Sequence, residues 1–152
     1  MIRAGLCALA LVLASGCAVG PAESGRCTLI GCDDGLRVDF TFRDRGAYVF
    51  DLIIDGNKTI CRATLPLTDP PPTPCDRPGV FLTLSGSKLP ADQQSLGGLS
   101  IASTTVRQIL LRITRNGEAV GTLDKTVDYR VTPGPNGPQC EPKECRQATL
   151  TL

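Results

Sequence analysis

Apolar and polar residues alternate with a period of two along much of the chain. The first such run, Arg37-Val38-Asp39-Phe40-Thr41-Phe42-Arg43, places Val38, Phe40 and Phe42 on one face. Successive side chains of a β-strand point to opposite faces, so this run predicts a half-buried strand. Comparable runs predict further strands at residues 48–54, 58–65, 80–84, 97–103, 106–115, 118–123 and 148–152, and the run at 118–123 continues irregularly toward Val131.

Turn-forming residues separate these predicted strands. Asp55-Gly56-Asn57 and Asn116-Gly117 supply the left-handed backbone positions of tight hairpin turns, so we expect hairpins around both. Residues 66–78 and 133–138 are rich in proline, which has no amide donor for a sheet, and both stretches are predicted loops. Residues 89–96 have room for at most one helical turn.

The strand count and the absence of an amphipathic helical pattern indicate an all-β fold. Seven to nine short strands, each with one polar face, are most economically covered by a two-sheet antiparallel sandwich of Greek-key or immunoglobulin-like type. A partly open β-barrel is the alternative. Four of the six aromatic residues lie at 40–50, in what we expect to be the first hairpin and the centre of the core.

The N-terminal residues carry a different pattern. Arg3 precedes an apolar stretch, Leu6 to Ala14, which is too short to span a bilayer and is typical of a secretory signal peptide. The stretch ends in Leu13-Ala14-Ser15-Gly16-Cys17, which resembles the lipobox of bacterial lipoproteins. The resemblance implies that Cys17 receives a diacylglyceryl group and becomes the mature N-terminus. The alternative is an ordinary signal peptide with Cys17 as a plain thiol.

The lipobox resemblance divides the chain into three parts. Residues 1–16 are the expected signal peptide, residues 17–26 a lipidated flexible tether, and residues 27–152 one β-sandwich domain. The residue after the cysteine is Ala18 rather than aspartate, which in this family implies the outer membrane more than the inner one. Loss of Arg3 from the 16 basic residues leaves 15, equal to the 15 acidic residues, so attachment of the protein to the bacterial cell envelope would rest on acyl chains.

Cysteine parity agrees with lipidation of Cys17. Of the eight cysteines, Cys7 would leave with the signal peptide and Cys17 would carry lipid, so six remain. An even number in an exported protein predicts disulfides: Cys27, Cys32, Cys61, Cys75, Cys140 and Cys145.

Two pairing schemes remain open for these six cysteines. In the first, Cys61 pairs with Cys75, and Cys27 and Cys32 pair with Cys140 and Cys145. In the second, Cys27–Cys32 and Cys140–Cys145 form local clips. Zinc binding is disfavoured because no C-x-x-C spacing occurs.

Composition excludes several kinds of chemistry. The chain has no histidine, so it has neither a Ser/His/Asp nucleophile nor a histidine-ligated metal site. A net charge of +1 without a basic run argues against nucleic-acid binding. We expect no cofactor. The polar groups that we considered as sites are better explained as turns or solvated faces: Asp33-Asp34-Gly35, Asp51, Asp55 and Asn57 for calcium or other ligands, and Arg107, Arg112 and Arg115 for anions.

These observations predict a non-catalytic envelope lipoprotein that binds or scaffolds an envelope protein or polysaccharide. One alternative is a protease-inhibitor-like module that presents the proline loop at 66–78. A second alternative is a carboxylate-dependent hydrolase, because two catalytic carboxylates need only be close in space.

Overall fold

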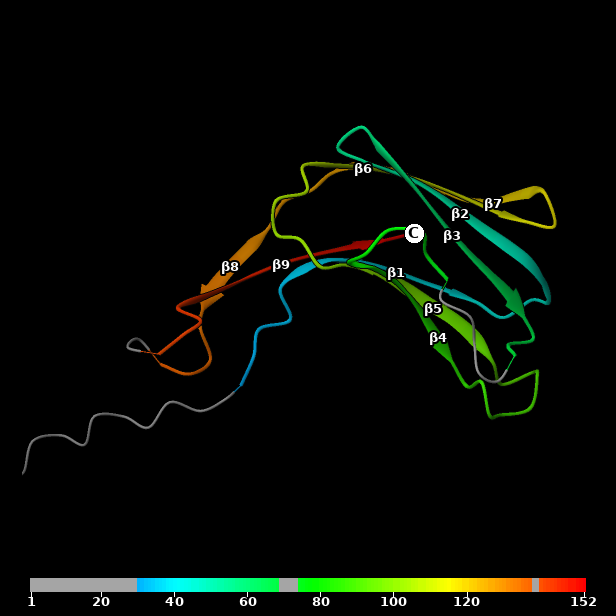
Figure 1. Cartoon of the computed structure of the whole chain (residues 1–152), viewed down its shortest axis with the longest axis horizontal. Coiled ribbons are helices and arrows are strands. Elements are labelled where there is room, and N and C mark those ends of the chain that lie inside the picture. Colours follow the sequence, from blue (N-terminus) through cyan, green and yellow to red (C-terminus); the bar gives the residue numbers. More distant parts are fainter. Residues whose placement is uncertain (1–29, 69–73, 138–139) are drawn as a thin grey trace, which may run out of the picture.

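The computed structural model describes residues 30–68, 74–137 and 140–152 and shows an all-β protein of two packed sheets, as predicted (Figure 1). The predicted signal peptide, Cys17, the tether and Cys27 lie outside the described residues. The strands are β1 (Gly35–Phe42), β2 (Gly46–Ile54), β3 (Asn57–Leu65), β4 (Val80–Ser85), β5 (Ser95–Ile101), β6 (Gln108–Arg115), β7 (Glu118–Thr126), β8 (Arg130–Pro133) and β9 (Glu144–Thr151). Within the described ranges, no helix has the length and apolar character needed to cross a membrane.

The strands are divided between a five-stranded sheet and a four-stranded sheet. The first has the order β4-β5-β1-β9-β8 and the second β3-β2-β6-β7. Along the chain, β1 lies in the five-stranded sheet, β2 and β3 lie in the four-stranded sheet, β4 and β5 in the first, β6 and β7 in the second, and β8 and β9 in the first again. In the five-stranded sheet, β1 and β9 are neighbours. These two strands are parallel, with Arg37 opposite Thr149, whereas the other paired strands are antiparallel. The parallel pair departs from the purely antiparallel expectation.

The core lies between the sheets and is formed by the apolar faces that the alternation identified. Val38 of β1, Phe50 and Leu52 of β2, and Ile109 of β6 are all fully buried. The first expected hairpin is present as β2 and β3, but Phe40 and Phe42 do not belong to it, because they lie on β1 in the opposite sheet. The aromatic residues therefore meet across the core, with the rings of Phe40 and Phe50 stacked and their centroids 5.4 Å apart.

Both predicted two-residue turns are present. Asp55 and Gly56 have φ values of 49° and 81°, and Asn116 and Gly117 have 52° and 87°. Two consecutive positive φ angles define the turn type that matches the twist of a hairpin. The Asp55 carboxylate also accepts hydrogen bonds from the backbone N–H groups of Arg107 and Gln108, each at 2.9 Å, and so fixes the start of β6.

The C-terminal part differs most from the sequence-based expectation. β8 is a separate strand in the five-stranded sheet, not an irregular continuation of β7, and β9 begins at Glu144 instead of Ala148. The start of β9 pairs with β8 before it reaches β1. Together with neighbouring residues, this extension forms an arm (residues 30–34, 130–137 and 140–146) that projects from the sandwich (Figure 1).

Covalent and polar links hold the arm together. A disulfide joins Cys32 to Cys145, with the Cα atoms 5.4 Å apart. The Asn136 side chain accepts a hydrogen bond from the Ile30 N–H at 3.2 Å and donates one to the Ile30 carbonyl at 2.9 Å. Cys140 is also disulfide-bonded. The first pairing scheme left open which of Cys27 and Cys32 pairs with Cys140, and Cys27 lies outside the described residues. The Cys32–Cys145 bond excludes the local-clip scheme.

A second disulfide, Cys61–Cys75, closes the base of the proline loop as the first scheme expects. Residues next to Cys75 extend the edge of β3: Arg62 N–H donates to the Pro74 carbonyl at 2.7 Å, and Asp76 N–H donates to the Ile60 carbonyl at 3.1 Å. The other end of the loop is held by buried Gln94, whose Oε1 accepts a hydrogen bond from the Leu67 N–H at 2.5 Å. Residues 69–73 lie outside the described residues.

Candidate ligand-binding face

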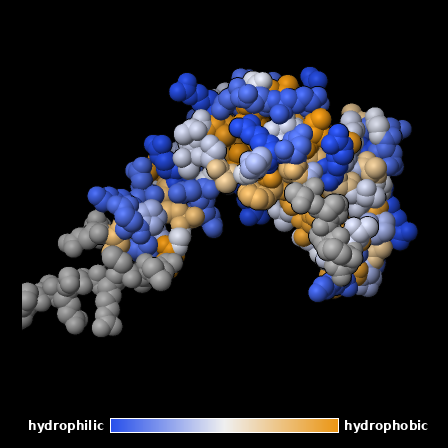
Figure 2. Space-filling view, in the orientation of Figure 1, coloured by the Kyte–Doolittle hydropathy of each residue, from blue (hydrophilic) through white to orange (hydrophobic). Residues whose placement is uncertain are grey.

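The five-stranded sheet has an outer face, turned away from the four-stranded sheet, that carries a pocket of about 470 Å³. The pocket lies where the arm joins the sandwich, and Figure 2 shows that the outline of the molecule is indented between these two parts. Its lining combines backbone and side chains of four adjacent strands with the last residues of the arm: Asp33, Asp34, Gly35, Leu36, Arg37, Phe81, Ser100, Ile101, Ala102, Gln147, Ala148 and Thr149.

The strand register arranges the polar lining in a row across the outer face. Phe81 of β4 lies opposite Ser100 of β5, which lies opposite Arg37 of β1, and Arg37 lies opposite Thr149 of β9. Neighbouring strands are about 4.8 Å apart, so this row spans roughly 10 Å from Phe81 to Arg37 and roughly 14 Å to Thr149. The outer-face pocket is therefore an elongated platform.

The floor of this platform is low because its side chains are small. Ser100 lies between the core residues Leu99 and Ile101 of β5, Ala102 follows the end of that strand, and Gly35 begins β1. Gly35 has a φ of 127°, and a Cβ atom there would lie 2.3 Å from the Ile101 carbonyl oxygen. The backbone thus requires glycine at this position, because the end of the neighbouring strand approaches too closely for any side chain.

Phe81 is the most exposed aromatic residue of the chain. Its relative exposure is 58%, whereas Phe40, Tyr48 and Phe50 are buried and Phe42 and Tyr129 are partly buried. From the sequence, Phe81 was expected in a strand but not in a site. The available signal was its position on the polar face of an alternating strand, Val80-Phe81-Leu82-Thr83-Leu84, where threonine is its neighbour on that face.

Charges of both signs lie on or beside the outer-face pocket. Arg37 forms an ion pair with Asp39, with Nε and Oδ1 2.5 Å apart, and both side chains are substantially exposed. Asp33 and Asp34 lie at the arm end of the pocket. The Asp34 Oδ1 atom accepts a hydrogen bond from the Arg146 N–H at 2.7 Å, so Asp34 links residues 30–34 of the arm to the start of β9. Of the Asp33-Asp34-Gly35 sequence, which was considered for calcium binding, the Asp34 carboxylate thus has a structural role.

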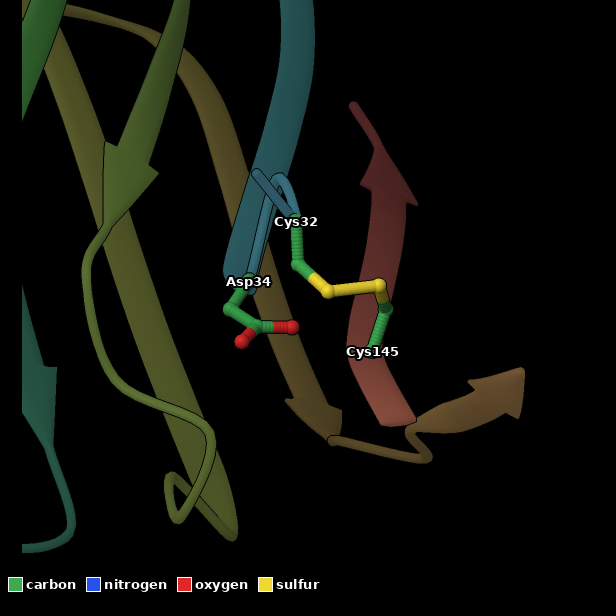
Figure 3. Close-up of side chains that lie close together, drawn as sticks. All are labelled: Cys32, Asp34 and Cys145. Carbon is green, nitrogen blue, oxygen red and sulfur yellow. A yellow bond between two sulfur atoms is a disulfide. The ribbon is translucent and has the colours of Figure 1, made fainter. Parts of the chain in front are cut away.

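Cys32, Asp34 and Cys145 lie close together and can be seen in Figure 3. Their sulfur and carboxylate oxygen atoms all lie within 4.8 Å of one another. Proteins bind metals through cysteine thiolates, and the two sulfurs are joined to each other in the disulfide. In this oxidised state, the group is a covalent link with a neighbouring carboxylate and not a set of metal ligands.

Two of the other polar residues considered from the sequence, Asp51 and Arg115, form ion pairs with neighbouring side chains. Asp51 forms a 2.9 Å ion pair with Lys58 across the β2–β3 hairpin. Arg115 lies opposite buried Tyr48 and pairs with Asp44.

The three arginines do not gather into one site. Arg112 lies on the solvent side of the four-stranded sheet and Arg115 at the end of its inner side, while Arg107 precedes the opposite end of β6. Hydrogen bonds from the Arg115 guanidinium to Tyr48 and Asp44 raise the pKa of Arg115.

The chain was compared with models of protein families, with curated proteins and with solved structures. None of the three comparisons found a match. The geometry described above is therefore what identifies the outer face of the five-stranded sheet as the candidate site.

Proposed function

We propose that this protein is a non-catalytic, lipid-anchored envelope protein that binds a ligand or partner on the outer face of its five-stranded sheet. The observation that carries the proposal is Phe81, a largely exposed aromatic ring beside a floor of small residues and polar groups. Binding sites combine apolar surface with a few polar groups in a depression, and this pocket has both.

The arm follows the proposed anchor in the sequence. Ile30 lies in the arm, 13 residues after Cys17, so the arm is the part of the domain nearest to the proposed lipid. A flexible tether of residues 18–26 would span roughly 15–20 Å. The outer-face pocket, which lies at the base of the arm, would then be within reach of other components of the envelope.

Site-specific crosslinking in cells tests the binding face. A photoreactive phenylalanine analogue placed at position 81 is expected to give discrete crosslinked products. The matched control is the same analogue at Ile53, which is 37% exposed on the outer side of the four-stranded sheet. Equal labelling from both positions, or no product from position 81, would contradict a binding role for the outer face.

The anchor is tested separately with Cys17→Ser. We expect the wild-type protein to carry a lipid mass on the N-terminal peptide and to fractionate with the outer membrane, and the variant to lose both properties. Inner-membrane retention of the wild type would contradict the outer-membrane assignment, and an unmodified Cys17 would contradict lipidation itself.

The braced base of the proline loop favours a second candidate function, protease inhibition. The Cys61–Cys75 disulfide and the Gln94–Leu67 hydrogen bond fix both ends of the loop, which reduces the entropy lost when a protease binds it. Titration of serine and cysteine proteases with the protein tests this function. Unchanged rates across the panel would dismiss it.

A further inference from the structure

We infer that the outer-face pocket binds a neutral saccharide of about two linked sugar rings. This inference rests on the proposed binding function and adds the chemical class of the ligand. It is carried by three features of the pocket: the position of Phe81 relative to the floor, the mixture of hydrogen-bond donors and acceptors, and the sign of the charges around it.

The first feature is a flat apolar surface beside an open floor. The C–H groups on one face of a pyranose ring form an apolar patch that packs well against an aromatic ring. Phe81 is available for such packing, since 58% of its surface is exposed. Ser100 lies directly opposite Phe81 on β5 and Ala102 follows on the same face, so a ring beside Phe81 would reach the sheet without displacing a large side chain.

The second feature is the chemistry of the polar groups. A sugar hydroxyl both donates and accepts hydrogen bonds, so a saccharide site needs both kinds of partner side by side. The Arg37–Asp39 ion pair offers guanidinium donors next to carboxylate acceptors at the middle of the outer face. Ser100, Gln147 and Thr149 each provide groups of both kinds along the same surface.

The third feature is the sign of the charges, which disfavours anionic ligands. An anion bound by Arg37 would meet the carboxylates of Asp39, Asp33 and Asp34 around the same pocket. A neutral, hydroxyl-rich ligand can use the Arg37 donors and the carboxylate acceptors without that repulsion. A cationic ligand is distinguished from a neutral one by the tetralysine comparator in the test.

The dimensions of the pocket set the ligand length. Its volume of about 470 Å³ is in the range of sites that enclose a small ligand. The row from Phe81 to Arg37 accommodates one ring stacked on Phe81 and a second ring over β1. Longer chains would continue past Thr149 toward the open side of β9, so a polysaccharide could bind internally as well as at its end.

Saturation-transfer NMR and calorimetry on the full lipidated protein in detergent test the inference. The probes are neutral tetrasaccharides of β-linked glucose, α-linked glucose, N-acetylglucosamine and mannose, with tetralysine and a tetragalacturonate as charged comparators. We expect at least one neutral probe to bind, with the affinity falling tenfold or more in Phe81→Ala and Arg37→Gln. Phe81→Tyr should retain binding, and the control Ile53→Ala should leave it unchanged.

The possible outcomes separate this inference from the proposed function. Binding of no neutral probe, or binding that Phe81→Ala leaves intact, would overturn the saccharide assignment. Binding of tetralysine that is lost in Phe81→Ala would overturn it too, while preserving the outer face as a binding surface. Thermal unfolding of each variant shows that the fold is retained, and Phe81→Tyr preserves the test if Phe81→Ala alters the edge strand.

Discussion

Thr59 is the position at which one substitution should stabilise the protein. Its side chain points from β3 into the core with 1% relative exposure, and its Oγ1 atom has no hydrogen-bond partner among the described residues. A buried hydroxyl without a partner costs about 1–3 kcal/mol, judged from protein mutations. Thr59→Val replaces this hydroxyl with a methyl group of nearly the same shape, so we expect the free energy of unfolding to rise by about 1–2 kcal/mol.

Equilibrium unfolding in urea with the disulfides intact measures this change, and the midpoint should rise with an unchanged slope. Thr64→Val, on the exposed side of the same strand, is the matched control and should lie within about 0.5 kcal/mol of wild type. Thr59→Ser keeps the hydroxyl and removes the methyl group, so it should destabilise the protein by about 1 kcal/mol. A destabilised Thr59→Val protein would refute the reasoning and show that the hydroxyl is satisfied in solution.

Three further predictions follow from the fold. Replacing both Cys61 and Cys75 with alanine should cost about 3 kcal/mol in unfolding experiments, the value for a loop of about 15 residues; no loss would show that the disulfide does not restrain the unfolded chain. Gly35→Ala should cost roughly 2 kcal/mol or more, because its Cβ would meet the Ile101 carbonyl, whereas Gly31→Ala, with no neighbour within 4 Å, should be neutral. Burial raises the pKa of Tyr129, whose hydroxyl donates to the Ser103 carbonyl at 2.9 Å. The stability that this neutral hydroxyl contributes is present below pH of about 10, its unfolded pKa, and is lost as the pH rises through the folded pKa. Tyr129→Phe should flatten that decline in unfolding free energy, and an equally steep decline in the variant would exclude Tyr129 as its source.

The parts of the fold that local patterns determine were predictable. Alternation identified the core faces of β1, β2 and β6, because a strand with one buried face must repeat apolar residues at every second position. Asn116-Gly117 was predictable as a turn because both residues tolerate positive φ.

Long-range partnerships were harder to predict. The parallel pairing of β1 with β9 joins residues more than 100 positions apart, and nothing in either strand specifies the direction of its neighbour. The early start of β9 was missed because Glu144-Cys145-Arg146-Gln147 lacks apolar alternation: only Cys145 of these four residues is buried, and most of the segment lies in the arm, which projects from the sandwich (Figure 1).

The candidate site was only partly predictable. Phe81 was visible as an apolar residue on the polar face of its strand, yet isolated exposed apolar residues are common on protein surfaces. Phe81 is distinguished by its place in a cross-strand row with Ser100, Arg37 and Thr149. This row depends on the register of four strands. That register is a property of the assembled sheet and not of any single segment.

The Cys32–Cys145 disulfide also determines how the domain would carry mechanical load. If the chain is held at Cys17 while a ligand is pulled away from the outer face, tension enters the domain through the arm. The disulfide passes that tension directly to β9, so β9 shares it with β1. These strands lie side by side and point in the same direction, so the load enters both at the same end and does not slide one along the other. A domain held through its arm would gain from this arrangement even where equilibrium stability is unchanged.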